Sequence, residues 1–262
     1  MLLDDWRFYA TAVPAVLAFG ISKGGIGGGA GILAVPLMAL VMSPAQAAAI
    51  MLPTLLVMDA IGIWSYRKDV DRPAVTALLP GALVGMLAAA AVFGLLSDAW
   101  VRIGIGVIAV AFCLYRWFGR SAAGRPHPVM GVVWGALAGF TSTLAHAGAP
   151  PANIYLLSLR LAPAAFVGTM VFLFAAVNLS KIVPYAALGL FTAETLTAAL
   201  VLMPVAAVGM ILGIRLLPRI DPKLFFRIIY AFVFVTGLKL LHDGIRGLDL
   251  GQMAGLGALL PA

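Results

Sequence analysis

An apolar stretch from residue 8 to residue 42 is interrupted by Lys23-Gly24-Gly25-Ile26-Gly27-Gly28-Gly29-Ala30-Gly31, and a second stretch, 129–160, is interrupted by His146-Ala147-Gly148-Ala149-Pro150-Pro151. Glycine runs and a Pro-Pro pair do not continue a helix. Each piece beside a break is about 10 to 17 residues long, which at about 1.5 Å per residue reaches halfway through a membrane or a little further. Backbone groups freed at that depth must line a cavity or lie buried in protein. We therefore predict two broken helices whose breaks meet inside the membrane.

The composition indicates an integral membrane protein. Of the 262 residues, 63% are hydrophobic and 10% are charged, whereas soluble domains carry about 25% charged residues. This deficit of charge excludes a soluble enzyme, a disordered tail and a nucleic-acid binder. In a membrane protein, the formal net charge of +7 mostly reports positive cytoplasmic loops.

The sequence has no pattern that is typical of an enzyme or a metal site. The single cysteine, Cys113, excludes an intramolecular disulfide, a redox pair and a Cys-based metal site. Ser/His/Asp, HExxH and CxxC patterns are absent, and three scattered histidines do not form a metal cage. We expect neither an enzyme nor a bound metal or cofactor.

Six uninterrupted segments are long enough to cross a membrane, for which a helix needs about 20 apolar residues. They are 45–66, 73–96, 99–118, 163–186, 193–217 and 222–242.

An internal repeat relates the two interrupted stretches. A shift of 119 residues pairs Gly20 with Gly139, Gly29-Ala30 with Gly148-Ala149, Pro44-Ala45 with Pro163-Ala164, Asp59 with Asn178, and Tyr66 with Tyr185. We predict a first membrane repeat, 1–118, a cytoplasmic linker, 119–128, a second repeat, 129–243, and a weakly apolar tail, 244–262.

The distribution of Lys and Arg separates two topologies. If each interrupted stretch crosses the membrane once, the two sides show no charge bias. If each is a re-entrant hairpin that returns to its own side, most of these residues lie together and three lie opposite. The first group is Arg67, Lys68, Arg72, Arg116, Arg120, Arg125, Arg160, Arg215, Arg219 and Lys223, and the second is Arg7, Arg102 and Arg246. The positive-inside rule favours the hairpins.

The hairpin topology also inverts the two halves relative to each other. Each half then has one hairpin, which returns to its own side, and three crossings, an odd number, so the second half begins on the opposite side of the membrane from the first. We predict an all-α polytopic protein of a bacterial-type inner membrane, with two inverted repeats that each contain a re-entrant (broken) helix hairpin plus three transmembrane helices. The loops at 67–72, 116–128 and 215–223 would be cytoplasmic. Inverted repeats with broken helices are typical of secondary transporters.

Lys23 and Lys181 are cations in apolar surroundings. An ionisable residue at membrane depth costs about 2.5–3.5 kcal/mol, so each is a candidate functional residue. The simpler alternatives are that Lys181 snorkels to the membrane interface and that Lys23 pairs with Asp59.

The breaks would supply hydrogen-bond donors beside these lysines. Amides after Gly25 to Gly29 and after His146 to Ala149 begin the following half-helices, where the helix dipole favours an anion. Nearby polar side chains would add hydrogen bonds, although Ser and Thr in membrane helices more often bond their own backbone. These side chains are Ser22, Thr141, Ser142, Thr143, Asn153 and Tyr155. We predict a pocket for a small oxyanion.

Asp59 and His146 are candidate proton-coupling residues. Asp59 lies near the middle of the second span, where it could carry a coupling proton, pair with Lys23 or be protonated and structurally silent. His146 could titrate near physiological pH or stay neutral and hydrogen-bonded. These alternatives remain open from the sequence.

Longer motifs surround both breaks. They are Gly20-Ile21-Ser22-Lys23-Gly24-Gly25-Ile26-Gly27-Gly28-Gly29, Val35-Pro36, Leu52-Pro53, Gly139-Phe140, Gly148-Ala149-Pro150-Pro151, Tyr155-Leu156-Leu157, Phe166-Val167-Gly168-Thr169 and Asn178-Leu179-Ser180-Lys181-Ile182-Val183-Pro184-Tyr185. With these motifs the chain resembles the sulfite exporter TauE/SafE family of membrane permeases. The resemblance implies a permease for sulfite, sulfonates or other small sulfur-containing anions, with Lys23, Asn178 and Lys181 at matching motif positions. The family pattern Gly-x-Gly-Gly-Pro reads His146-Ala147-Gly148-Ala149-Pro150 here, which narrows the space beside a bound anion.

The leading hypothesis is a secondary transporter that exports a small sulfur-containing anion, such as sulfite, a sulfonate or sulfoacetate, by alternating access. The anion would bind at the membrane midplane, and the coupling ion would be a proton or sodium. An anion channel, or a permease for another small anion, is the alternative. The predicted substrate-binding residues are Lys23, Gly25, Gly27, Gly28, Gly29, Ser142, Thr143, His146, Gly148, Asn153, Tyr155, Asn178 and Lys181.

Overall fold

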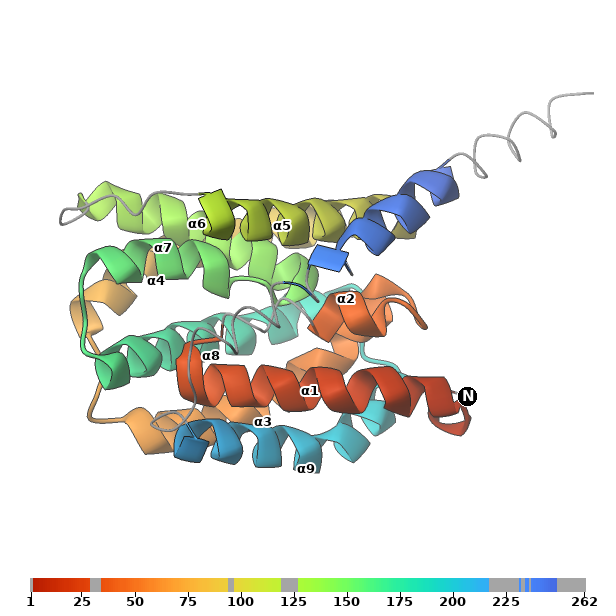
Figure 1. Cartoon of the computed structure of the whole chain (residues 1–262), viewed down its shortest axis with the longest axis horizontal. Coiled ribbons are helices and arrows are strands. Elements are labelled where there is room, and N and C mark those ends of the chain that lie inside the picture. Colours follow the sequence, from red (N-terminus) through yellow and green to blue (C-terminus); the bar gives the residue numbers. More distant parts are fainter. Residues whose placement is uncertain are drawn as a thin grey trace, which may run out of the picture.

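A computed structural model describes residues 2–28, 34–93, 97–118, 127–216, 231, 234–235 and 237–248. Within these ranges the secondary structure is helical, as the composition predicts. The helices are η1 (Leu2–Asp4), α1 (Trp6–Ile26), α2 (Ala34–Met38), α3 (Pro44–Tyr66), α4 (Arg72–Phe93), α5 (Asp98–Phe118), α6 (Pro128–Ala145), α7 (Ala149–Ser158), α8 (Pro163–Ala187) and α9 (Ala193–Leu216). Residues 237–248 are also helical. The long helices lie side by side along the longest axis of the molecule (Figure 1).

Five helices in the described part of the chain are long and apolar enough to cross a membrane: α1, α3, α4, α8 and α9. The last four match the predicted segments 45–66, 73–96, 163–186 and 193–217 closely. The predicted segment 99–118 is the helix α5, although α5 is not among these five. The predicted segment 222–242 lies mostly outside the described residues.

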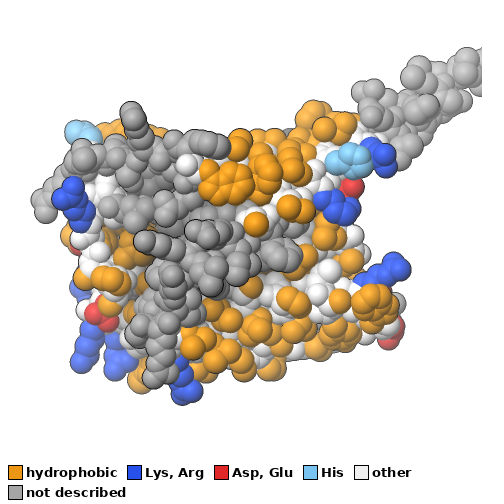
Figure 2. Space-filling model, viewed as in Figure 1, with side chains coloured by type: hydrophobic (Ala, Val, Ile, Leu, Met, Phe, Trp, Pro, Cys, Tyr) orange, Lys and Arg blue, Asp and Glu red, His pale blue; other side chains and the backbone are white. Residues whose placement is uncertain are grey.

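The surface agrees with a lipid environment. Large apolar side chains such as Val183, Trp64 and Val84 are 73%, 71% and 65% exposed. Figure 2 shows hydrophobic side chains along the upper and lower parts of the visible face and Lys and Arg toward its left and right ends. A polar solvent would oppose so much apolar exposure, whereas lipid tails accommodate it.

Helix α1 corrects one prediction. It runs without interruption for 21 residues, through Lys23 and Gly25, whereas the sequence predicts a break that begins at Lys23 and leaves a shorter piece. The helix ends after Ile26, because Gly27 adopts a left-handed conformation with φ of 74° and donates its N–H to the Ser22 carbonyl. Single glycines cost a helix only about 1 kcal/mol each relative to alanine.

Close packing explains why α1 tolerates its glycines. A Cβ atom added at Gly20 would lie 2.8 Å from the Met210 backbone nitrogen, and one at Gly25 would lie 3.0 Å from the Gly213 carbonyl oxygen. Helices α1 and α9 therefore approach each other backbone to backbone, which larger side chains at these positions would prevent.

The second break resembles the first in its geometry. Helix α6 ends at Ala145, and His146 adopts a left-handed conformation with φ of 51° and donates its N–H to the Ser142 carbonyl. His146 and Gly27 are the pair that the predicted 119-residue shift relates. Helix α7 begins three residues after His146, at Ala149.

Two tyrosines add to this correspondence. The Tyr66 hydroxyl donates to the Gly24 carbonyl near the end of α1, and the Tyr185 hydroxyl donates to the Thr143 carbonyl near the end of α6, at 2.7 Å. The donor and the acceptor of the second bond each lie 119 residues after those of the first. Helix α1 packs on α9, and α6 packs on α4. These correspondences support the predicted repeat.

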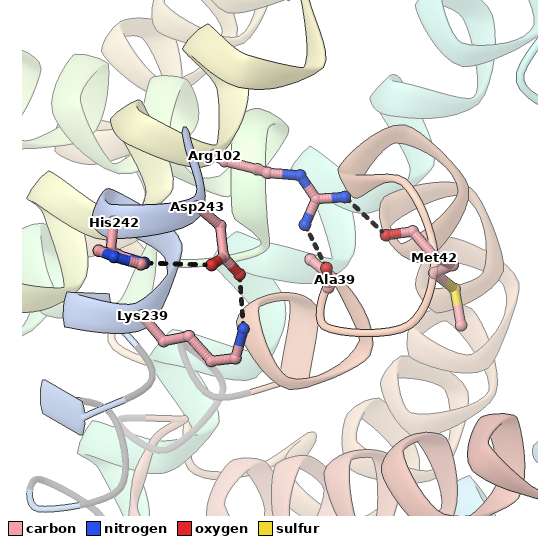
Figure 3. A network of polar contacts seen from close by, with 6 residues as sticks. All are labelled: Ala39, Met42, Arg102, Lys239, His242 and Asp243. Carbon is pink, nitrogen blue, oxygen red and sulfur yellow. Dashed lines mark hydrogen bonds and ion pairs between the residues drawn. The ribbon is translucent and has the colours of Figure 1, made fainter. Parts of the chain in front are cut away.

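Arg102 of α5 holds the turn between α2 and α3. Its guanidinium donates to the carbonyls of Ala39 and Met42 (Figure 3). Beside it in the same view, Lys239 pairs with Asp243 at 2.6 Å. Two carbonyls in the turn after α2 are thereby satisfied by one side chain.

The packing of α6 on α4 predicts that Gly139→Ala destabilises the protein. A Cβ atom at position 139 would overlap the Ala82 carbonyl oxygen, which belongs to a helix backbone and has little room to move. Overpacking of this kind costs about 1–3 kcal/mol. Gly104→Ala is the matched control, because nothing lies within 4 Å of its added Cβ. In detergent, the unfolding temperature of Gly139→Ala should be clearly lower than that of the wild type, and that of Gly104→Ala should not. Equal unfolding temperatures for the two variants would contradict the close packing of α6 on α4.

Candidate functional site

A small pocket lies where the two helix breaks meet. It is partly open, and it is lined by Phe19, Lys23, Gly28, Leu55, Ser142, His146, Ala149, Phe174 and Asn178. These residues come from α1, α3, α6, α7 and α8 and from the two breaks.

Lys23 and Asn178 share one carboxylate. The Lys23 Nζ lies 2.7 Å from Asp59 Oδ1, and Asn178 Nδ2 donates to Asp59 Oδ2 at 2.7 Å. All three side chains are buried, with exposures of 6%, 3% and 2% for Lys23, Asp59 and Asn178. Of the alternatives left open for Asp59, the structure supports its pairing with Lys23.

Lys181 is wholly buried and points inward. Its Nζ lies 3.1 Å from both the carbonyl and the hydroxyl oxygen of Ser142 and 2.9 Å from His146 Nδ1. The alternative in which Lys181 snorkels to the interface is therefore wrong. Lys181 reaches the pocket through Ser142 and His146, which line it, and is not itself a lining residue.

The hydrogen bonds of His146 identify its neutral form. Its Nε2 lies 2.9 Å from the Ala48 carbonyl oxygen, which can only accept a hydrogen bond. Nε2 therefore carries the ring proton, and Nδ1 is left to accept from Lys181. A second proton on Nδ1 would point at the ammonium group.

The carbonyls at the end of α6 attract donors. Lys181 donates to the Ser142 carbonyl and Tyr185 to the Thr143 carbonyl, in the last turn of α6. The negative end of a helix dipole favours a cation there. Lys23 likewise lies in the last turn of α1. The breaks thus collect cations at helix C-termini.

The structure leaves fewer backbone amides available to an anion than the sequence predicts. Pro150 and Pro151 have no N–H, and the Gly28 amide donates to the Ser22 carbonyl. Gly25 lies inside α1 against Gly213 and is not a lining residue of the pocket. Gly29 lies outside the described residues.

Other predicted site residues have different neighbours. Thr141 and Thr143 donate their hydroxyls to carbonyls of their own helix, as membrane threonines commonly do. Gly27 caps α1. The remaining four are not lining residues of the pocket: Ser22, Gly148, Asn153 and Tyr155. The structure therefore gathers five of the predicted binding residues around the pocket: Lys23, Gly28, Ser142, His146 and Asn178.

Sequence reasoning misses the apolar wall of the pocket. Phe19, Leu55, Ala149 and Phe174 form it. In a chain that is 63% hydrophobic, no local signal separates these residues from those that face lipid.

The site carries an excess of positive charge. Asp59 is the buried carboxylate among the described residues, and Lys23 neutralises it. The hydrogen-bond partners of Lys181 in the described part of the chain are all uncharged. A buried cation without a counter-charge attracts an anion strongly, because the surrounding dielectric is low.

The family comparison agrees with this chemistry. The family model described as sulfite exporter TauE/SafE matches residues 12–240, which is most of the chain. Comparisons with curated proteins and with solved structures found no match.

The ion pair predicts a specific pattern of stability. Asp59→Asn should lower the free energy of unfolding by about 3–5 kcal/mol, because it leaves the Lys23 charge buried and unpaired. Lys23→Met combined with Asp59→Asn should recover most of this loss, since the amide oxygen introduced at position 59 could still accept from Asn178. Unfolding of the single and double variants in detergent measures the difference. If the double variant is as unstable as Asp59→Asn alone, the loss of stability does not come from an unpaired Lys23 charge.

Proposed function

We propose that this chain, which belongs to the sulfite exporter TauE/SafE family, is a secondary transporter that exports small sulfur-containing anions such as sulfite, sulfonates or sulfoacetate by alternating access. At the level of the family the chain is a membrane transporter and not an enzyme. The observation that carries the proposal is the pocket beside Lys181, a buried cation whose hydrogen-bond partners are neutral. An anion would supply the missing charge.

The alternating mechanism requires two halves that move against each other. The proposed halves are 1–118 and 129–243, inverted with respect to one another. The matched tyrosine bonds and left-handed helix ends support this division. In Figure 1, α1 and α3 begin at the same end of the molecule, and α6 and α8 begin at the other end. This arrangement supports one re-entrant hairpin in each half, directed from opposite sides.

The bond between Asp59 and Asn178 supports a moving contact between the halves. The two residues are 119 apart, the spacing of the repeat, and each belongs to a different half. Residues related by a twofold axis meet when they lie beside that axis. The proposed anion site therefore lies between the two halves, where rocking would expose it first to one side and then to the other.

The coupling ion is proposed to be a proton, held by Asp59 or His146, with sodium as the alternative. An anion that binds Lys23 competes with Asp59 for the same ammonium group, which is 2.7 Å from the carboxylate. Protonation of Asp59 would release Lys23 to the anion. Binding of the anion would then be coupled to the protonation of Asp59 through the same network.

The proposed orientation has the loops at 67–72, 116–128 and 215–223 on the cytoplasmic side of an inner membrane. The end of α3, the start of α4, the start of α8 and the end of α9 lie together at one end of the molecule (Figure 1). Arg67, Lys68, Arg72 and Arg215 lie at or beside these helix ends, which supports a shared positive side.

An anion channel is the second candidate function, and the same lysines would serve it. Channel conduction requires weak binding and a continuous path. The pocket is instead small and lined by large side chains such as Phe19 and Phe174, which favours the transporter. Single-channel current in planar bilayers would favour the channel.

Removal of either buried lysine should stop transport. Lys23→Met and Lys181→Met are each expected to reduce sulfite flux in proteoliposomes at least about a hundredfold, because each removes a positive charge from a low-dielectric site. Lys239→Met is the matched control, since Lys239 is exposed and pairs with Asp243 at the surface. Flux close to wild type in both folded variants would refute the proposed anion site.

Cysteine labelling tests the hairpin topology. In a Cys113→Ala background, Lys68→Cys, Arg160→Cys and Arg215→Cys should react with an impermeant maleimide from one side of the membrane. Arg7→Cys and Arg246→Cys should react from the other side. All five positions are exposed. Labelling of positions 68 and 215 from opposite sides would instead support two single crossings in place of the hairpins.

A further inference from the structure

We infer that the end of the molecule at which α3 and α9 finish binds an anionic phospholipid. Arg67 and Arg215 would hold the phosphate group of the lipid, and Trp64 would lie beside its acyl chains. The inference goes beyond the proposed function and does not depend on it. Three features of this end support it: an excess of positive charge, the convergence of two arginine-bearing helices, and exposed apolar side chains next to both arginines.

The two ends of the molecule differ in charge. Around the ends of α3 and α9 and the starts of α4 and α8 (Figure 1), the described side chains include five exposed cations and two carboxylates. They are Arg67, Lys68, Arg72, Arg160 and Arg215, with Asp69 and Asp71. At the opposite end, the described cations and carboxylates are equal in number. They are Arg7, Arg102, Lys239 and Arg246, with Asp4, Asp5, Glu194 and Asp243. Excess positive charge at one face of a membrane protein attracts anionic headgroups.

Two of these cations converge because their helices pack together. Helix α3 packs on α9, and both reach the same turn of α1. The Tyr66 hydroxyl donates to the Gly24 carbonyl, and a Cβ atom added at Gly24 would lie 3.1 Å from the Ile214 backbone nitrogen. Arg67 directly follows Tyr66, and Arg215 directly follows Ile214. Packed helices lie about 8–10 Å apart, so two arginine side chains at their ends can reach one phosphate group.

Trp64 and Arg67 mark the level of the membrane interface. Trp64 is 71% exposed in the last turn of α3, and tryptophan concentrates at the boundary between hydrocarbon and headgroups. The Arg67 guanidinium lies over the Trp64 ring, with its Cζ 4.4 Å from the ring centroid, and donates to the Trp64 carbonyl at 2.6 Å. Arginine has five N–H donors, so this guanidinium retains donors for the oxygens of a phosphate.

An exposed apolar side chain lies one helical turn before each arginine. Ile63 precedes Arg67 by four residues, and Ile211 precedes Arg215 by four residues, so each isoleucine shares a helix face with its arginine. Both isoleucines are exposed. They lie further from this end of the molecule than the arginines do, where the acyl chains of a bound lipid would contact them. A free phosphate ion would lack these contacts, which favours a lipid.

The loop beside this surface is held in place before any lipid binds. The Asp71 amide donates to Thr169 Oγ1 at 2.9 Å, and the Asp71 carboxylate accepts from the Ala74 amide at 2.9 Å. A Cβ atom at Gly168 would overlap the Asp69 carbonyl oxygen, so the loop lies directly against α8. A loop that is already ordered loses little conformational entropy when a ligand binds beside it.

Quenching of tryptophan fluorescence tests the inference. The full-length chain is reconstituted in phosphatidylcholine vesicles that contain a small, equal fraction of either phosphatidylglycerol or phosphatidylcholine brominated near the headgroup. The difference between wild type and Trp64→Phe gives the quenching of Trp64. We expect phosphatidylglycerol to be enriched beside Trp64 at least about fivefold over phosphatidylcholine, the ratio that corresponds to about 1 kcal/mol, the attraction of one Lys or Arg near a membrane surface. Equal quenching by the two lipids would overturn the inference.

Arginine variants locate the bound headgroup. Arg67→Gln and Arg215→Gln should each lower the enrichment at least about twofold, because each removes a cation from the phosphate. Arg160→Gln is the matched control, since it removes the same charge at the same end but from the turn between α7 and α8. The enrichment compares two lipids in one variant, so a change in the fluorescence of Trp64 itself cancels.

Two further results would overturn the inference. If Arg160→Gln lowers the enrichment as much as Arg67→Gln and Arg215→Gln do, the lipid responds to diffuse charge and not to a site at the ends of α3 and α9. If millimolar inorganic phosphate relieves the quenching by brominated phosphatidylglycerol, the site takes a soluble phosphate in preference to a lipid. Neither result bears on the proposed function, because no step of the experiment measures transport.

Discussion

The burial of Lys181 away from water is the constraint on which the rest of the site depends. A cation in such surroundings costs several kcal/mol unless polar groups and charge surround it. At the end of α6, the Ser142 carbonyl and the negative end of the helix dipole stabilise the Lys181 ammonium group, and the Nδ1 atom of His146 accepts a further hydrogen bond from it. These partners are neutral, so they solvate the ammonium group without cancelling its charge. The charge that remains is what an anion in the adjacent pocket would neutralise.

The two helix breaks make this arrangement possible. A continuous α6 would use its carbonyls within the helix, whereas its end at His146 leaves the Ser142 and Thr143 carbonyls available to Lys181 and Tyr185. At the end of α1, Tyr66 bonds Gly24 in the corresponding way. The glycines of the breaks thus have a second role beyond ending helices. A Cβ atom added at Gly27 would lie 2.7 Å from the Phe166 ring, and one at Gly148 would lie 2.5 Å from the Phe174 ring, so these glycines let neighbouring side chains pack closely against the breaks.

The sequence predicted the long helices well and their interruptions less well. Apolar length is a local property, so α3, α4, α8 and α9 lie close to their predicted ranges. The continuity of α1 through Gly25 depends on its contact with Gly213 of α9, a residue far along the chain. In the site, Lys23, Asp59 and Asn178 were identifiable because polar residues are rare in apolar segments. Phe19 and Leu55 were not, because nothing local distinguishes an apolar residue beside a pocket from one beside lipid.

By itself the sequence determined the helical membrane class and the small set of polar residues at membrane depth, and it indicated two breaks without fixing where the first begins, because composition and periodicity act over neighbouring residues. It also indicated the 119-residue repeat. The tertiary structure alone decided the partners: Lys23 with Asp59, Asp59 with Asn178, and Lys181 with His146. These pairings determine that the charge of Lys23 is neutralised and that the charge of Lys181 is left for a ligand. They depend on distances of about 3 Å between atoms on different helices, and no pattern along a single helix encodes such distances.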